Sequence, residues 1–307
     1  MKLVFMGTPE FAVPSLERLA AEHDVARVFT QPDRPANRGQ KLTAPPVKQS
    51  ALALGLAVEQ PLKIRTPEVF ATLQAIAADA IVVVGYGKLI PQSIIDLPRL
   101  GVINLHASLL PKYRGAAPIN WAIVRGETTT GVTTMKIDAG LDTGDMLLRE
   151  EVAIAPEDDA VSLGAKLAQI GAPLLSRTLA GLERGEITPV PQDHSQHSLA
   201  PILRKEDGLA NWSLSAREVH NRVRGLAPWP GVYSPYRGSV LRVEKSAVDE
   251  SPASDAPGTL IVEDKRLFVA CGRGRLELLE VRREGRRKLS TKDFLIGERL
   301  QPGERLG

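Results

Sequence analysis

The feature that most constrains this chain is the regular exchange of short β-branched runs with helical patterns over its first two hundred residues. Such alternation is typical of βαβ units, which build a mostly parallel sheet covered by helices. The sequence therefore predicts an α/β domain at residues 1–187. Its expected strands are Lys2–Met6, Val25–Thr30, Ala80–Val84, Gly101–Asn104 and Gly131–Ile137.

Between and after these strands, apolar residues recur at helical spacing in three stretches. They predict helices near residues 11–20, 69–76 and 161–182. Gly185 follows the third stretch and is a plausible helix stop. The first domain is then a Rossmann-like sheet with helices, closed by the longest of them.

The remainder of the chain changes character twice. Residues 188–207 lose periodicity and fill with Pro, Gln, Ser and His, which predicts a surface linker. Ser215 and Glu218 then form a capping-box pattern at a helix start. Short strands separated by turns follow from Val232 to Val281, which indicates a small β-barrel at residues 208–307. An OB-like barrel is one option among several.

Composition narrows the class of protein. The chain has 307 residues, of which 43% are hydrophobic and 24% charged, so a disordered or fibrous chain is excluded. A single cysteine, Cys271, can close no internal disulfide, and this favours a reducing cytoplasm. We find no signal-peptide pattern and no apolar run near the roughly 18 residues of a membrane helix. We therefore expect a cytoplasmic protein without membrane attachment, and a monomer by default.

Charge is unevenly distributed along the chain. Residues 201–307 hold 20 basic and 15 acidic side chains, a surplus of +5, whereas the whole chain carries +3 and residues 1–200 therefore carry −2. The basic residues crowd at Arg282, Arg283, Arg286 and Arg287, followed by Lys288. Such a run is either a solvated hairpin or a patch that contacts phosphates, and the sequence leaves both open.

Two early loops could bind anions. Gly7-Thr8-Pro9-Glu10 follows the first strand, but it has one glycine where a dinucleotide fingerprint needs three, so a tight turn is favoured over an NAD site. Residues 31–42, QPDRPANRGQKL, carry Arg34, Arg38 and Lys41 on a segment partly stiffened by proline. These cations could reach a phosphate or carboxylate, or could simply solubilise the loop.

The most informative segment runs from Gly101 to Pro118, GVINLHASLLPKYRGAAP. Asn104 and His106 come at the carboxyl end of an expected parallel strand, where open α/β sheets place their ligands. Strand alternation puts the two side chains on one face. An amide can donate to a developing oxyanion and an imidazole can move a proton near neutral pH, although a lone strand histidine can equally be a core residue.

A third group follows the next strand in MKIDAGLDTGDMLL. Asp138, Asp142 and Asp145 lie in this loop, which we expect at the same edge of the sheet as His106. Their spacing does not match a calcium-binding loop, so no metal is predicted. A carboxylate near His106 would hold the imidazole as a proton acceptor. A nucleophilic hydrolase is disfavoured because no G-x-S-x-G elbow accompanies the histidine.

These motifs together resemble the folate-dependent formyltransferases. The resemblance rests on GTPEFAVPSL, QPDRPANRGQKL, VVVGYGKLIP, NLHASLLPKYRGAAPINWA, DAGLDTGD, LRKEDG and APWPG, in that order over nearly the whole chain. It extends to the branch that acts on methionyl-tRNA. It implies transfer of a formyl group from 10-formyltetrahydrofolate, without a metal, to the α-amino group of methionine on aminoacylated initiator tRNA.

The resemblance also implies roles for particular residues. The catalytic Asn, His and Asp of the family pattern fall on Asn104, His106 and Asp142, and Arg38 matches the arginine of a loop that enters the tRNA acceptor arm. The segment implied in folate binding is Ser108, Leu109, Leu110 and Pro111. The linker departs from the family pattern at Leu199, Ile202 and Asn211, which bears on contacts to tRNA alone.

Two other functions compete with this interpretation. A formyltransferase acting on a small amine would share the first domain, but the basic second domain and the loop at residues 31–42 disfavour it. A non-catalytic RNA-binding protein would need only the basic barrel, yet single-strand binders usually interleave aromatic stacking platforms, and this chain is 4% aromatic.

Overall fold

The protein is described by a computed structural model that covers residues 1–36, 41–252 and 254–307. The chain divides into two compact units. Unit 1 comprises residues 1–118, 129–153 and 164–201, and unit 2 comprises residues 119–128, 154–163 and 202–307. The sequence places residues 119–128 and 154–163 in the first domain, whereas in the structure they belong to unit 2.

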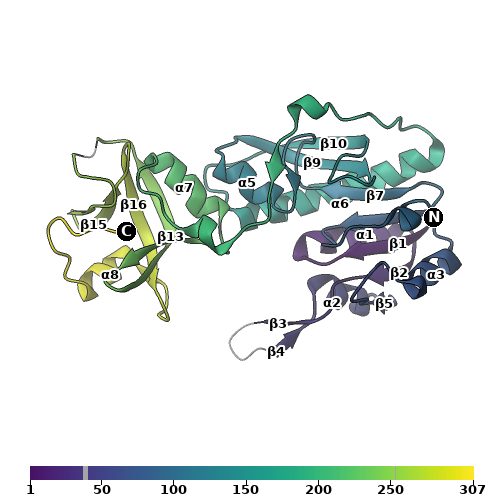
Figure 1. Cartoon of the computed structure of the whole chain (residues 1–307), viewed down its shortest axis with the longest axis horizontal. Helices are drawn as coiled ribbons and strands as arrows, with labels where there is room; N and C mark the ends of the chain where they lie inside the picture. Colours follow the sequence, from purple (N-terminus) through teal and green to yellow (C-terminus); the bar gives the residue numbers. More distant parts are fainter. Residues whose placement is uncertain (37–40, 253) are drawn as a thin grey trace. The chain divides into compact units, whose positions relative to one another are not determined.

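Unit 1 is built on a seven-stranded sheet in the order β10-β9-β7-β6-β1-β2-β5 (Figure 1). The neighbours from β7 to β5 pair in parallel, whereas β9 is antiparallel to β7 and β10 is antiparallel to β9. The mostly parallel, Rossmann-like fold predicted from the sequence is therefore confirmed. The strands are β1 (Lys2–Gly7), β2 (Asp24–Phe29), β5 (Val58–Glu59), β6 (Ala80–Val84), β7 (Val102–His106), β9 (Thr129–Lys136) and β10 (Met146–Ala153).

The longer helices of unit 1 carry apolar stripes that pack into its core. On one face, Val69 and Leu73 pack with Val4, Ile81 and Val102 in a single buried cluster. The helices of unit 1 are η1 (Glu10–Ala12), α1 (Val13–Glu22), α2 (Pro46–Ala53), α3 (Pro67–Ile76), α4 (Gln92–Ile95), most of α6 (Ala160–Arg184) and η2 (His194–Gln196). Two short pairs complete the unit: β3 (Arg34–Ala36) with β4 (Lys41–Thr43), and β8 (Arg114–Gly115) with β11 (Leu199–Ala200).

Unit 2 is an antiparallel sheet in the order β12-β13-β16-β15-β14. The chain end spans the space between the two outer strands. The N–H of Leu306 donates to the carbonyl of Gly258 before β14, and the N–H of Gly307 donates to Pro235 of β12. The C-terminal residues thus close the sheet into a barrel. Its strands are β12 (Val232–Tyr236), β13 (Ser239–Asp249), β14 (Leu260–Glu263), β15 (Arg266–Ala270), β16 (Arg275–Arg283) and the short β17 (Leu289–Ser290), which pairs with β16.

Helices complete unit 2. Helix α7 (Ala216–Gly225) begins with the predicted capping box, in which Ser215 and Glu218 satisfy each other's backbone N–H groups. The other helices are η3 (Lys205–Gly208), α8 (Thr291–Gly297) and α5 (Pro118–Val124) after its first residue. Cys271 lies in the apolar core of this unit, and burial raises the pKa of its thiol to about 11.

The last residue of α7 makes a close approach to α5. A Cβ at Gly225 would lie 2.7 Å from Val124 Cγ2, 2.8 Å from the carbonyl oxygen of Asn120 and 2.9 Å from the backbone nitrogen of Val124. Two of these three atoms belong to the backbone and cannot rotate away. The side chain of Asn120 also donates to the Gly225 carbonyl at 2.8 Å, which fixes the helices at this spacing.

We predict that Gly225→Ala destabilises unit 2 by about 1–3 kcal/mol, the usual cost of overpacking. Urea unfolding followed by tryptophan fluorescence measures this, because Trp121, Trp212 and Trp229 all lie in unit 2. Gly297→Ala is the matched control, since Gly297 also ends a helix but has nothing within 4 Å of its Cβ position. Equal midpoints for the two variants would show that the approach of α7 to α5 is not tight.

Candidate active site

Strand β7 carries the first two candidate residues. Asn104 and His106 alternate with Ile103 and Leu105, so they share the face of Val102, while Leu105 lies against Gly171 of α6 on the other face. Both side chains are nearly buried, with Asn104 8% and His106 5% exposed. The strand therefore presents an amide and an imidazole side by side on the face away from α6.

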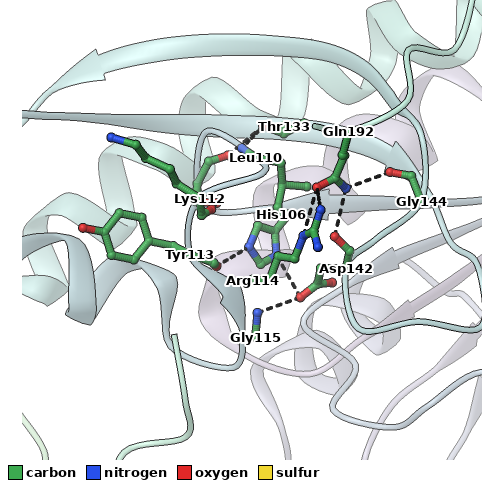
Figure 2. Close-up of polar contacts among 11 residues, drawn as sticks. His106, Leu110, Lys112, Tyr113, Arg114, Gly115, Thr133, Asp142, Gly144 and Gln192 are labelled. Atoms are coloured by element: carbon green, nitrogen blue, oxygen red, sulfur yellow. Dashed lines mark hydrogen bonds and ion pairs between the residues drawn. The ribbon is translucent and has the colours of Figure 1, made fainter. Parts of the chain in front are cut away.

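The ring of His106 is held at both nitrogens. Nε2 lies 2.9 Å from the carbonyl oxygen of Tyr113, and Nδ1 lies 3.7 Å from Oδ2 of Asp142 (Figure 2). A carbonyl only accepts, so Nε2 carries a proton and donates it. Nδ1 is then the nitrogen that faces the carboxylate of Asp142.

Asp142 reaches His106 by a route that the sequence did not predict. We expected its loop at the carboxyl edge of β7, but β9 is antiparallel to β7, and the N–H of Ile137 donates to Val102 at the opposite end of the strand. The loop must therefore fold back to bring Asp142 to His106. The predicted proximity of Asp142 to the ring is present, but the predicted position of the loop is wrong because strand direction is not encoded locally.

The turn at Asp142 is unusual in its backbone. Asp142 has φ +51°, in the left-handed region, and its Oδ2 accepts a hydrogen bond from the N–H of Gly115 at 2.9 Å. Asp138 has a different role, since its carboxylate accepts from Thr143 Oγ1 at 2.7 Å and from the N–H of Gly140 at 3.0 Å. Of these two carboxylates, the one at Asp142 faces the imidazole and the one at Asp138 shapes the loop.

The amide of Asn104 has no hydrogen-bond partner in the part of the chain that the structure describes. Its backbone is paired on both sides, with Val83 of β6 and Met135 of β9. The side chain is 8% exposed, and its amide atoms are not among the fully buried polar atoms that lack a partner, so the amide keeps some contact with solvent. This side chain is thus free to donate to a group that enters the site.

The loop after His106 shows which of the predicted folate-contacting residues are accessible. The side chains of Ser108 and Leu110 are buried, whereas Leu109 and Pro111 are partly exposed. Thr133 Oγ1 donates to the carbonyl of Ser108 at 2.7 Å and accepts from the N–H of Leu110 at 3.2 Å. The loop therefore offers Leu109 and Pro111 as apolar contacts, while Ser108 and Leu110 support it from inside.

Residues 190–200, which the sequence predicts to be surface linker, contribute to the site. β11 pairs in parallel with β8, and Ser198 binds the site loop through both its side chain and its carbonyl. These bonds fix Tyr113 and Arg114. A Cβ at Gly115, which has φ +121°, would lie 2.6 Å from the carbonyl oxygen of Ala200. No periodicity or motif in this stretch signals these contacts.

The predicted anion-binding residues of unit 1 are only partly described. Arg34 is exposed in β3, Lys41 begins β4 without a described side chain, and Arg38 lies outside the described residues. The strand pair β3–β4 is preceded by Asp33, whose carboxylate accepts from Lys48 and Gln60 at 2.8 Å. These two hydrogen bonds, that of Lys48 first, lower the pKa of Asp33.

The four arginines of unit 2 fall into two kinds. Arg282 pairs with Glu244 at 2.7 Å and Arg283 with Glu298 at 2.6 Å. Arg286 and Arg287 are exposed and have no ion-pair partner among residues 1–36, 41–252 and 254–307. Arg283, Arg286 and Arg287 line a hollow of about 510 Å³ that Phe294 of α8 also lines. Of the four arginines predicted to contact tRNA, Arg286 and Arg287 therefore carry a charge that no described acid neutralises.

The described residues hold no group of three or more His, Cys, Asp or Glu side chains that could bind a metal ion. No helix within the described ranges is long and apolar enough to span a bilayer.

Comparison with known proteins agrees with the resemblance at the motif level. Residues 1–179 match the family model described as formyl transferase, and residues 202–299 match that of the formyl transferase C-terminal domain. The methionyl-tRNA formyltransferase of Solibacter usitatus is 57% identical over 308 residues, covering 100% of this chain and 99% of that protein. That of Geobacter metallireducens is 48% identical over 309 residues, with the same coverage.

Solved structures agree in fold at low sequence identity. The N-formyltransferase from Helicobacter canadensis, in complex with folinic acid and dTDP-3-aminofucose, matches with a TM-score of 0.68 and 19% identity, covering 91% of this chain and 98% of that one. The phosphoribosylglycinamide formyltransferase of Streptococcus pneumoniae covers 59% of this chain and 98% of that one, with a TM-score of 0.50 and 21% identity. On the matches of both family models and of the full-length relatives, the chain belongs to the formyl transferase family.

Proposed function

We propose that this chain transfers the formyl group of 10-formyltetrahydrofolate to the α-amino group of methionyl initiator tRNA. The observation that carries the proposal is the pair of His106 and Asp142 beside the unpartnered amide of Asn104. The choice of acceptor is supported by the methionyl-tRNA formyltransferases that match the whole chain. Such an enzyme works where charged initiator tRNA is found, in the cytoplasm. We propose a monomer as the default state.

The residues present fit a folate donor. Leu109 and Pro111 offer partly exposed apolar surface in the loop that follows His106, and Asn104 offers a free amide donor. When bound, the donor supplies a formyl carbon whose oxygen becomes negative as an amine adds to it. We propose that Ser108 and Leu110 hold the loop in shape, since both side chains are buried.

The chain's own residues then have distinct roles in the transfer. Asn104 donates to the developing oxyanion, a contact that strengthens as charge accumulates. His106 keeps Nε2–H on Tyr113 and takes up the amine proton at Nδ1, which it later returns to the departing nitrogen. Asp142 stabilises the doubly protonated ring across 3.7 Å, a separation that can shorten when substrates fill the site.

Binding of a tRNA acceptor requires cationic side chains, because its backbone phosphates are negatively charged. We propose that Arg286 and Arg287 do so in unit 2, because both are exposed and neither is neutralised by a described acid. Arg282 and Arg283 contribute less, since glutamates already compensate their charges. Arg34, Arg38 and Lys41 are proposed to contact the acceptor arm from the loop in unit 1.

The direct test incubates the protein with 10-formyltetrahydrofolate and one of three acceptors. Methionine-charged initiator tRNA should become blocked at its amine, whereas free methionine and glycinamide ribonucleotide should remain unmodified. Mass spectrometry of the acceptor gives the readout. Formylation of the small amine at an equal or higher kcat/KM would replace the proposed acceptor.

We predict that His106→Ala lowers kcat by about 10²- to 10⁴-fold, because the transition state loses its proton carrier. KM for both substrates should change much less, since the ground state loses no required contact. Steady-state kinetics measure both constants. His23→Ala, which removes an imidazole at the end of α1, should behave as the parent protein. Unchanged kcat with a raised KM for folate would make His106 a ligand and not a catalyst.

For Asn104→Ala we predict a decrease in kcat of about 10²- to 10³-fold, the usual effect of removing one oxyanion donor. Asn120→Ala gives the opposite pattern as a comparison: it removes the bond from α5 to the Gly225 carbonyl, so it should lower stability and leave kcat unchanged. Folding of Asn104→Ala should be nearly unaffected, because the Asn104 amide has no partner to lose in the described structure. A large loss of stability with parental kcat would contradict the assigned role.

We predict that Arg286→Ala with Arg287→Ala weakens tRNA binding and lowers the slope of log binding constant against log salt by roughly 1 per lost phosphate contact. Filter binding from low to moderate salt measures this slope. Replacing Arg184 and Arg217, which are exposed but paired with glutamates, is the charge-matched control. The same slope for both double variants would place the tRNA elsewhere.

A further inference from the structure

One side chain outside the predicted set makes four hydrogen bonds next to the catalytic pair. Gln192 Nε2 donates to the carbonyls of Asp142 at 2.9 Å and Gly144 at 2.8 Å (Figure 2). Its Oε1 accepts from Arg114 Nε at 3.0 Å and from Arg114 Nη2 at 2.6 Å. Gln192 and Arg114 are each only 5% exposed. The amide therefore links the aspartate loop to β8 in a site shielded from water.

The orientation of this amide is fixed by its partners. The carbonyls of Asp142 and Gly144 can only accept, and a guanidinium can only donate. Turning the Gln192 amide by 180° would set its oxygen against two carbonyls and its nitrogen against two donors. The network thus has one arrangement, in which the two donor and two acceptor positions of Gln192 are all used.

The aspartate loop needs such a restraint. The N–H of Ile137 is tied to Val102 at the far end of β7, and Asp142 takes a left-handed φ of +51°, which is unfavourable for a residue with a Cβ. The Gly115 N–H bond holds the carboxylate, but it does not hold the backbone of the turn. Gln192 binds that backbone on both sides of Thr143, at residues 142 and 144.

Arg114 donates the two hydrogen bonds that orient the Gln192 amide. Its guanidinium is buried, yet in the described structure it contacts no carboxylate: its partners are Gln192 Oε1 and His194 Nδ1, the latter at 3.2 Å. A buried cation bound by neutral acceptors costs stability relative to one that meets an acid. A glutamate at position 192 would give the arginine a counter-ion but would repel the carbonyls of Asp142 and Gly144.

We propose that Gln192 is a positioning residue for the formyl transfer: oriented by Arg114, it holds the turn at Asp142 so that the carboxylate faces His106. The inference rests on the proposed function, because it assigns Gln192 its effect through Asp142. All four hydrogen-bonding positions of the Gln192 amide are used by protein groups. It acts on the distance between Asp142 Oδ2 and His106 Nδ1, now 3.7 Å.

Gln192→Glu separates this role from simple support of the fold. The carboxylate gives Arg114 a counter-ion, so the variant should unfold at the same or a higher urea concentration than the parent. It cannot donate to Asp142 and Gly144, so kcat should fall by about 10- to 100-fold, as expected for a displacement of about 1 Å. KM for both substrates should stay within about twofold. Gln196→Glu, the same change at an exposed site in the same segment, should leave kcat unchanged.

A double-mutant cycle tests whether the effect passes through Asp142. If Gln192 acts by placing that carboxylate, then Gln192→Glu added to Asp142→Asn should lower kcat no further than Asp142→Asn alone. Multiplication of the two losses would show an independent structural role and overturn the proposal. Parental kcat in Gln192→Glu, with Asp142→Asn impaired, would overturn it while leaving the proposed function intact.

A crystal structure of Gln192→Glu gives a readout that needs no activity. The proposal expects the turn at Asp142 to move and the distance from Asp142 Oδ2 to His106 Nδ1 to exceed that of the parent crystal by about 1 Å. An unmoved turn would overturn the positioning role. Because this measurement requires no acceptor, it holds even if the parent protein fails to formylate methionyl-tRNA, which would count against the proposed function alone.

Discussion

The site depends on the direction in which one imidazole hydrogen bond points. Because the carbonyl of Tyr113 can only accept, Nε2 of His106 must donate, and Nδ1 is left to face Asp142. A proton at Nδ1 then lies between the ring and a carboxylate, in a place that excludes most water. The backbone of one short loop thereby leaves Nδ1 as the nitrogen that the proposed transfer uses, with Asp142 as the residue that faces it.

That loop couples the two members of the pair. Tyr113 supplies the carbonyl for the ring, and Gly115, two residues later, supplies the N–H for Asp142. The segment is tied in turn to Ser198 and Ala200 by parallel pairing. A shift of this segment would therefore move ring and carboxylate together, whereas the backbone of the aspartate turn needs its own restraint, which Gln192 provides.

Much of this molecule follows from local sequence. Short runs of apolar residues mark β1, β6 and β7. The helical spacing of Leu163, Leu167 and Leu174 marks α6, because the buried face of a helix leaves a repeating apolar pattern in the sequence. Asn104 and His106 were singled out because their side chains carry recognisable chemistry, whereas Asp142 was chosen among three aspartates by the resemblance to the family. Their roles in catalysis are predictions, while the approach of Asp142 to the His106 ring is a property of the fold.

What could not be predicted depends on pairing between distant segments. Nothing local distinguishes β9 as antiparallel, so the aspartate loop was expected at the wrong edge of the sheet. Gln192 lies 78 residues from Arg114 and 50 from Asp142, in a polar stretch typical of a linker. Gln192 restrains the turn because it is buried. A buried glutamine must form its hydrogen bonds with protein groups and not with water, so it fixes the positions of those groups. Burial of a polar side chain is decided by the folded chain. A polar residue in an aperiodic segment therefore cannot be assumed from the sequence alone to be exposed to solvent.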